Sequence, residues 1–226
     1  MVVNVVTVEE FRTKTLKAVD IYLKKKDEER KPCIFVLDSL GMLSTNKEIN
    51  DALAEKDTRD MTKAQLIKGA FRMLTLKLGQ ANIPMLVTNH TYESMSLYGG
   101  KQMSGGSGLQ YAASTIIYLS KSKEKDGTEV IGNIIRAKTQ KSRLSKENQQ
   151  VEIRLFYDER GLDRYYGLLE LGEMGGMWKN VAGRYEIDGK KIYAKQILKE
   201  PDVYFTVEVM NQLDKIARKE FSYGES

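Results

Sequence analysis

The sequence feature that most constrains the fold of this chain is an uninterrupted apolar run that ends at an acidic residue. Residues 33–37 read Cys-Ile-Phe-Val-Leu, and Asp38 and Ser39 follow directly. A strand that is apolar on both faces belongs in the middle of a parallel sheet, with helices covering each side. An acid just after it lies at the carboxyl edge, where open α/β sheets bind ligands. Two interpretations stay open here: Asp38 holds magnesium beside a nucleotide, or it caps the next turn.

The composition limits the classes of protein that fit. The 226 residues suffice for one domain of ordinary size with a small appendage. The chain has no long apolar run and no secretory signal at its start, so we expect a cytoplasmic protein without a membrane partner. One cysteine and one histidine exclude a His/Cys zinc site and an internal disulfide. The net charge of +5 permits binding to a polyanion without requiring it.

Two helices and a second strand are expected around the apolar run. A capping box at Thr7 and Glu10 opens a helix that ends in the charged run 24–31. Apolar residues at spacings of three and four predict a helix over 64–78, which Gly79 and Asn82 end. Residues 83–89 are a second buried strand, and His90 follows it. Since little chain precedes the first helix, we expect the beginning of a doubly wound domain to be missing.

Two segments have the composition of functional loops. Residues 44–60 are polar and of mixed charge, and a surface loop with a helical turn is the simpler interpretation. Residues 91–108 form a long loop rich in glycine and hydroxyl groups, and such loops are usually functional or disordered. Neither loop, nor any other part of the sequence, contains the phosphate-loop pattern Gly-x-x-x-x-Gly-Lys-Ser/Thr.

The second half predicts antiparallel strands and then an appendage. Strands are expected over 115–119, 130–137 and 151–157, with a tight turn at Asp126-Gly127, as an antiparallel extension of the parallel sheet. A basic cluster at 138–143 lies just beyond the second of these strands, where an exposed turn is the simpler interpretation. Residues 168–226 hold a hairpin about Asp188-Gly189, an amphipathic helix over 207–219 and the only tryptophan, Trp178.

Four segments carry a resemblance to a known family. They are IFVLDSLG (34–41), NIPMLVTNHTYE (82–93), SGGSGLQYAAS (104–114) and KSR (141–143). In order and spacing they resemble the RecA-type recombinases, and within that family most closely the UvsX-type recombinases of phages. The resemblance implies an α/β fold: a partial RecA-like P-loop NTPase core over 1–167, with a mixed, mostly parallel sheet flanked by helices. A small C-terminal α+β appendage follows over 168–226.

The resemblance also implies roles for particular residues. Asp38 takes the place of the Walker B acid and ligates Mg²⁺, with Ser39 beside the nucleotide. His90 takes the place of the residue that senses the terminal phosphate of ATP. Lys141 and Arg143 resemble the cations that reach into the site of a neighbouring subunit in a filament. The loops 44–60 and 91–108 resemble single-stranded DNA-binding loops, whose candidate residues are Lys47, Lys56, Arg59, Met95, Tyr98, Lys101, Gln102, Met103, Ser104, Gly105, Gly106 and Ser107.

The missing phosphate loop leaves the enzymatic status open. The family is a DNA-dependent ATPase, but these residues lack the phosphate loop and the catalytic glutamate that precede the Walker B strand in it. We therefore expect the later portion of an ATP- and Mg²⁺-dependent recombinase of the host-cell cytoplasm, with an N-terminal complementing chain as a partner. The alternative is a non-catalytic module that binds single-stranded DNA or modulates filaments. A replicative helicase of the same superfamily fits the loop at 105–108 and the cluster at 141–143 less well.

Overall fold

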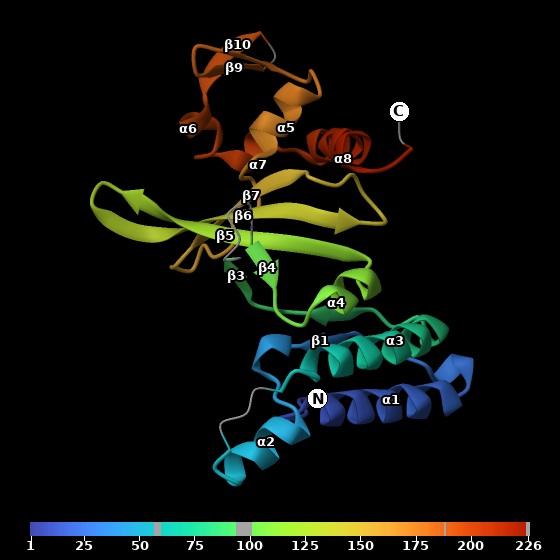
Figure 1. Cartoon of the computed structure of the whole chain (residues 1–226). Coiled ribbons are helices and arrows are strands. Elements are labelled where there is room, and N and C mark those ends of the chain that lie inside the picture. Colours follow the sequence, from blue (N-terminus) through green and yellow to red (C-terminus); the bar gives the residue numbers. More distant parts are fainter. Residues whose placement is uncertain (57–59, 94–100, 188, 225–226) are drawn as a thin grey trace. The chain divides into compact units, whose positions relative to one another are not determined.

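The computed structural model describes residues 1–56, 60–93, 101–187 and 189–224. It divides into two compact units, Met1–Ala113 and Ser114–Ser226, and the ribbon in Figure 1 traces both. Each unit is described by itself. Among the described residues, no helix has both the length and the apolar character that crossing a membrane requires.

The first unit combines long helices with very short strands. Its elements are α1 (Val8–Lys24), η1 (Asp27–Glu29), β1 (Phe35–Leu37), η2 (Leu40–Met42), α2 (Asn46–Leu53), α3 (Lys63–Ala81), β2 (Met85–Val87), β3 (Thr91–Glu93), β4 (Lys101–Met103) and α4 (Ser107–Ala112). The predicted capping box of α1 is confirmed in part: Thr7 Oγ1 accepts a hydrogen bond from Glu10 N at 3.1 Å, but the Glu10 side chain accepts from Val6 N rather than from Thr7 N. The predicted end of α3 is confirmed at Asn82, which has the left-handed φ of 51°.

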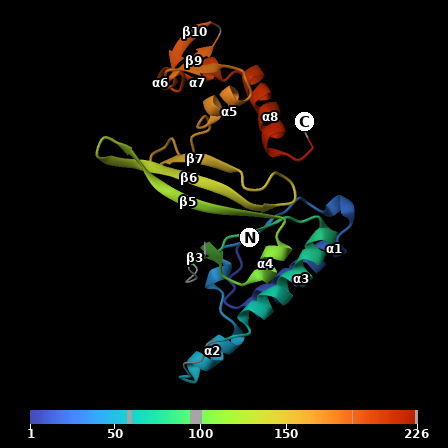
Figure 2. The ribbon, with the colours of Figure 1, turned by 45° about the horizontal axis from the view of Figure 1, so that its top comes forward.

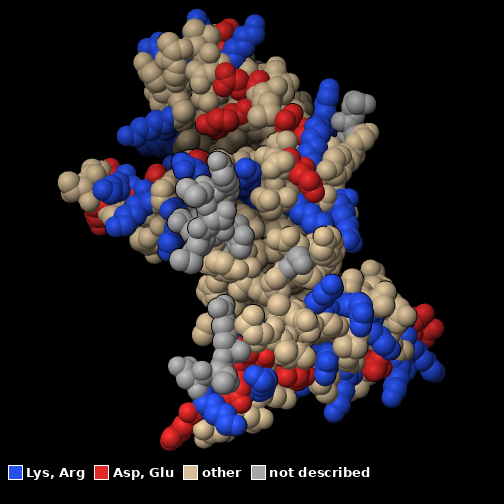
Figure 3. Space-filling view, viewed as in Figure 1, with Lys and Arg blue, Asp and Glu red and all other residues tan. Residues whose placement is uncertain are grey.

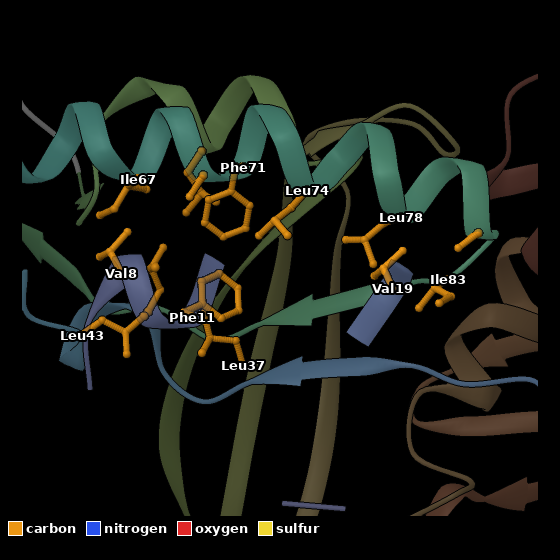
Figure 4. Packing of buried hydrophobic residues seen from close by; sticks show 14 residues of the cluster. Val8, Phe11, Val19, Leu37, Leu43, Ile67, Phe71, Leu74, Leu78 and Ile83 are labelled. Atoms are coloured by element: carbon orange, nitrogen blue, oxygen red, sulfur yellow. The ribbon is translucent and has the colours of Figure 1, made fainter. Parts of the chain in front are cut away.

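The core of this unit lies between the helices and one face of a parallel strand pair. β1 pairs with β2, with Phe35 opposite Met85 and Leu37 opposite Val87. Figure 4 shows the α3 side chains Ile67, Phe71, Leu74 and Leu78 pointing toward Val8, Phe11 and Val19 of α1 and toward Leu37. These apolar contacts hold α1, α3 and the strand pair together.

The prediction of a strand buried on both faces is wrong. Val36 and Leu86, which alternate with the core-facing residues, are 61% and 55% exposed. Ile34 and Cys33, predicted to be buried in the strand, are exposed as well. The physical reason is that α1 and α3 pack on one face only, so a run of apolar residues alternates between the core and solvent.

The two predicted loops hold more regular structure than expected. Within 44–60, Thr45 opens the eight-residue helix α2 with a complete capping box to Glu48. Within 91–108, β3 and β4 pair as an antiparallel hairpin, with Thr91 opposite Met103. The helix α4 begins at Ser107, within the last residues of this predicted loop.

The second unit begins with an antiparallel sheet. Its strands are β5 (Thr115–Asp126), β6 (Glu129–Ser142) and β7 (Gln150–Phe156), in the order β5-β6-β7 (Figure 2). The predicted turn between β5 and β6 is confirmed, with Asp126 opposite Glu129 and Gly127 at a φ of 60°. Figure 3 shows that basic side chains, with a few acidic ones between them, cover much of this hairpin.

Two predictions about this sheet are wrong. No described strand of it pairs with β1 or β2, so the strands form their own antiparallel sheet rather than the wing of one mixed sheet. The basic cluster is not a turn beyond a strand, because β6 runs on to Ser142. The long partner β5 supplies pairing up to Thr115, and this keeps the basic segment extended.

The appendage has a hydrophobic core of its own. Its elements are α5 (Leu168–Met174), β8 (Lys179–Val181), β9 (Arg184–Ile187), β10 (Lys190–Tyr193), α6 (Ala194–Ile197), α7 (Pro201–Tyr204) and α8 (Val207–Phe221). The predicted hairpin is β9–β10, and the predicted amphipathic helix is α8. Its buried cluster consists of Leu169, Trp178, Tyr185, Ile197, Phe205 and Leu213. Trp178 Nε1 donates to Leu169 O at 2.6 Å, which satisfies the buried indole.

Candidate functional site at the strand ends

The acid that ends β1 is held by the strand beside it. Thr88 Oγ1, just past the end of β2, donates to Asp38 Oδ1 at 2.6 Å. The backbone continues the parallel pairing, since Thr88 N donates to Leu37 O at 3.0 Å and Leu40 N donates to Thr88 O at 3.0 Å. The peptide bond between Asp38 and Ser39 is cis. Asp38 is exposed, so its carboxylate is oriented by Thr88 while remaining open to a ligand.

A second set of hydrogen bonds joins the end of β2 to the start of the glycine-rich segment. Asn89 Nδ2 donates to Ser104 O at 2.8 Å, and Ser104 Oγ donates back to Asn89 Oδ1 at 2.6 Å. Ser104 N donates to His90 O at 3.2 Å. His90 is therefore tied through its own backbone to the residue that follows β4.

Gly41 makes room for this arrangement. A Cβ at Gly41 would lie 2.8 Å from His90 Cδ2 and 3.3 Å from Asn89 Oδ1. The turn after Asp38 thus lies directly against the residues that follow β2. Asp38, Asn89, His90 and Ser104 form one group, which we call the strand-end cluster.

The two glycines after Ser104 have backbone conformations that suit glycine. Gly105 has a φ of 92° and Gly106 a φ of 73°. A Cβ at Gly105 would lie 3.4 Å from Ile67 Cδ1, so this backbone passes close to α3. Met103, a DNA-loop candidate above, is partly buried against the core of this unit. Its assignment to DNA binding stays a prediction.

The buried carboxylate of Asp60 joins the two ends of the other predicted loop, residues 44–60. Asp60 accepts from Thr45 Oγ1 at 2.6 Å and from Thr62 Oγ1 at 2.7 Å. The hydrogen bond from Thr45, followed by those from Thr62, lowers the pKa of Asp60 from its ordinary 3.8 to about 2. Between these ends, Lys47 on α2 pairs with Asp51 at 3.2 Å and Lys56 is exposed.

Several predicted nucleic-acid residues cannot be placed on a surface. Arg59, Met95 and Tyr98 lie outside the described residues. For Lys101, Gln102 and Ser107 only the backbone is described, in β4 for the first two and at the start of α4 for the third. Their assignment to DNA binding stays a prediction.

The predicted cations lie in the second unit, at the end of β6. Lys141 is within the strand and Arg143 just past it, with Arg143 N donating to Ser114 O at 3.0 Å. Ser142 between them is buried, and its Oγ accepts from Leu144 N and Ser145 N at 3.1 and 3.0 Å. The structure thus gathers Asp38, Ser39 and His90 in one unit and Lys141 and Arg143 in the other.

The sequence analysis missed three members of this site. Thr88 and Asn89 were treated as the end of a strand, and Gly41 as part of a motif without a role. Their positions in the sequence could have indicated them, because polar residues follow β2 at the same sheet edge where Asp38 follows β1.

The strand-end cluster suits a divalent cation that takes only some of its ligands from the protein and the rest from a bound molecule and water. One oxygen of Asp38 accepts from Thr88, and a carboxylate oxygen is a preferred ligand of Mg²⁺. The described residues contain no group of three or more His, Cys, Asp or Glu that could hold a metal alone. A Mg²⁺ at Asp38 would therefore take its other ligands from phosphates and water. The cluster lies at the carboxyl ends of two parallel strands, the edge at which open α/β sheets bind ligands.

Comparison with known proteins identifies the family. A model of the RecA N-terminal domain matches residues 18–163. The recombination and repair protein of Enterobacteria phage T4 is 37% identical over 159 residues, which cover 70% of this chain and 40% of the phage protein. RecA of Desulforapulum autotrophicum is 28% identical over 191 residues, which cover 82% of this chain and 54% of that protein. RecA of Clavibacter michiganensis is 27% identical over 184 residues, or 77% and 50% of the two chains.

This chain belongs to the RecA family, and its resemblance to the phage members is confirmed. The chain spans about half the length of the curated relatives it matches.

Proposed function

We propose that this chain is the Walker B and DNA-loop portion of an ATP-dependent recombinase that exchanges strands in homologous recombination and DNA repair. The observation that carries the proposal is the strand-end cluster. In it, Asp38 is oriented by Thr88, and the adjoining Asn89 and His90 are hydrogen-bonded to Ser104. The consecutive residues Thr88, Asn89 and His90 thus link the acid, through one hydrogen bond, to the start of the glycine-rich segment, through three more.

At the nucleotide, Asp38 and the residues near it have distinct proposed tasks. Asp38 supplies an oxygen ligand to Mg²⁺, which would neutralise charge on the phosphates of ATP. Thr88 fixes the rotamer of that carboxylate, as the partners of metal ligands commonly do. Ser39 and the exposed His90 face the nucleotide, and His90 senses its terminal phosphate. Because Ser104 N donates a hydrogen bond to His90 O, a shift of His90 would move the residues after β4.

The DNA-binding role is assigned to the two loops. Gly105 and Gly106 carry no side chain that would keep a phosphate from their backbone N–H groups, and such groups suit phosphate oxygens. Lys47 and Lys56 contribute charge from the other loop, with Arg59, Tyr98, Lys101, Gln102, Ser104 and Ser107 as further candidates. We propose single-stranded DNA as the ligand and a homo-oligomeric filament as the assembly. In that filament Lys141 and Arg143 would stabilise charge on the phosphoryl group held by a neighbouring subunit.

A complementing chain is part of the proposal. No phosphate-loop pattern occurs in these 226 residues, and a triphosphate held by Asp38 alone has few partners. The face of β1–β2 away from the core carries the exposed Val36 and Leu86, and such an apolar sheet face suits contact with another polypeptide. We infer that a polypeptide bearing the phosphate loop covers this face and completes the nucleotide site.

The test is reconstitution with the corresponding phosphate-loop segment of a RecA-family relative. The mixture should hydrolyse ATP faster when single-stranded DNA is added. Asp38→Asn should remove at least about 99% of that stimulated rate, since it removes a charged ligand of the metal. The matched control is Asp20→Asn, which removes an exposed carboxylate paired with Lys77 at 2.9 Å in the same unit. Equal rates for Asp38→Asn and the unaltered chain would overturn the assignment.

The absence of the phosphate-loop pattern also favours a second candidate, a non-catalytic module that binds single-stranded DNA or modulates filaments. In that case the chain should bind a labelled oligonucleotide equally well with and without ATP and the phosphate-loop segment. Its affinity should fall with salt according to a few phosphate contacts. Binding that strengthens with ATP only in the mixture would favour the recombinase instead.

A further inference from the structure

The loop between β6 and β7 is attached to the end of the C-terminal helix. Ser145 forms an antiparallel bridge with Ser222, the residue that follows α8. Lys146 N donates to Phe221 O at 2.8 Å, and Lys146 Nζ donates to Lys219 O at 3.2 Å. These groups lie within one compact unit, although 73 positions separate Lys146 from Lys219.

The attachment has a physical cause in α8. The last four carbonyl groups of a helix have no partner inside the helix. Ser222 N satisfies Arg218 O, and Lys146 satisfies two more, those of Lys219 and Phe221. The ammonium group also meets the negative end of the helix dipole. Lys146 therefore caps α8 from a distant part of the chain.

The same loop is connected to the proposed cations. Ser145 N and Ser145 Oγ both donate to Ser142 Oγ at 3.0 Å, and Ser142 N donates to Glu147 Oε1 at 3.0 Å. Ser142 is buried and stands between Lys141 and Arg143. Any loosening of Ser145 and Lys146 from α8 is therefore passed to the backbone that carries both cations.

We propose that Lys146 is a positioning residue for phosphoryl transfer. By capping α8 it fixes the backbone of 141–143, so that Lys141 and Arg143 are presented in one geometry. The C-terminal appendage thereby contributes to hydrolysis without touching the nucleotide. The inference rests on the proposed function in its claim about catalysis, but the capping contact can be tested in this chain alone.

The experiment compares Lys146→Glu, Lys146→Arg and a control. Lys146→Glu reverses the charge at the end of α8, whereas Lys146→Arg keeps a donor and the charge. The control, Lys215→Glu, makes the same charge change at an exposed position of the same helix. Amide hydrogen exchange of peptides covering 141–147 and 219–222 is measured in the whole chain, and ATP hydrolysis in the reconstituted mixture.

For Lys146→Glu we expect exchange in both peptides to accelerate about five- to tenfold, because a favourable charge at a helix end becomes unfavourable. The kcat should fall by a similar factor while KM for ATP stays unchanged. Lys146→Arg should restore both quantities, and Lys215→Glu should leave both unaltered.

Unaltered exchange in Lys146→Glu would overturn the cap. Faster exchange with an unchanged kcat would overturn the positioning role. If exchange in the chain alone responds as expected but the unaltered chain shows no DNA-stimulated hydrolysis in the mixture, the proposed function is contradicted and the cap stands.

Discussion

The two compact units differ in where they leave apolar surface exposed. In Met1–Ala113, helices cover one face of the β1–β2 pair, and Val36 and Leu86 face solvent on the other. In Ser114–Ser226, the appendage closes a cluster around Trp178 and Leu213 with strands and helices of its own. The second unit also leaves apolar sheet residues exposed, Ile117 and Leu119 of β5, but that strand does not lead to the strand-end cluster. In the first unit, therefore, the sheet edge with the strand-end cluster and the proposed partner surface belong to the same two strands, β1 and β2.

The largest expected effect tests whether the two cores are separate. Leu74 and Leu213 are both fully buried, one in each unit. Each Leu→Ala change should cost about 2–5 kcal/mol of unfolding free energy by leaving a cavity. Urea denaturation is followed by far-ultraviolet circular dichroism and by fluorescence of the only tryptophan, Trp178, which lies in the second unit.

Leu213→Ala should lower the urea midpoint of the fluorescence transition, which reports the second unit. Leu74→Ala should leave that midpoint unchanged and lower the midpoint of the remaining dichroism transition, which reports the first unit. Identical shifts of both signals in both variants would mean that the chain unfolds as one body, and the comparison of the units would lose its basis.

The next prediction concerns the exposed sheet face. Changing Val36 and Leu86 together to Lys should weaken association with the phosphate-loop polypeptide about a hundredfold, because two charges would have to be desolvated in the contact. The measurement is a binding titration by calorimetry. The matched control changes Ile117 and Leu119, exposed apolar residues of β5, to Lys. Equal weakening by both pairs would point to a general effect of charge.

A smaller effect is expected from the group that orients Asp38. Thr88→Val keeps the side-chain shape but removes the 2.6 Å hydrogen bond to the carboxylate. The Mg²⁺ concentration needed for half-maximal hydrolysis by the mixture should rise about ten- to a hundredfold. Thr75→Val, which removes a hydroxyl bonded to Phe71 O within α3, is the control. An unchanged Mg²⁺ requirement would show that Thr88 does not support the metal ligand.

The smallest effect is a pH dependence in the first unit. Since the pKa of Asp60 in the folded chain is about 2, below its ordinary 3.8, the charged group stabilises the fold above about pH 4. That contribution is lost as the pH falls through 2. Asp60→Asn should therefore lower the urea midpoint at pH 5 and flatten its decline toward pH 2. Asp20→Asn is the control, and a decline as steep in Asp60→Asn as in the unaltered chain would contradict the assignment.

What the sequence could predict was local. The spacing of Ile67, Phe71 and Leu74 predicted α3, and Asp126-Gly127 predicted the β5–β6 turn, because helix period and turn chemistry depend on near neighbours. The position of Asp38 directly after β1 also followed from order along the chain, whereas β2 ends at Val87, two residues before the predicted end at 89.

What could not be predicted depends on partners distant in sequence. An apolar run such as 33–37 does not reveal how many layers will cover it, so the exposure of Cys33 and Val36 was missed. The length of β6 through Lys141 depends on pairing with β5, and the bond between Asn89 and Ser104 depends on the β3–β4 hairpin. The capping of α8 by Lys146 joins residues too far apart for any local pattern.

The most direct test of the central claim is ATP hydrolysis in the presence of single-stranded DNA by the purified chain alone and after titration with the phosphate-loop polypeptide. The account predicts no turnover above background for the chain alone, and a rate that rises to saturation near one equivalent of the added polypeptide. Turnover by the chain alone at the rate of the saturated mixture would contradict the claim that Asp38 and His90 form only part of a nucleotide site.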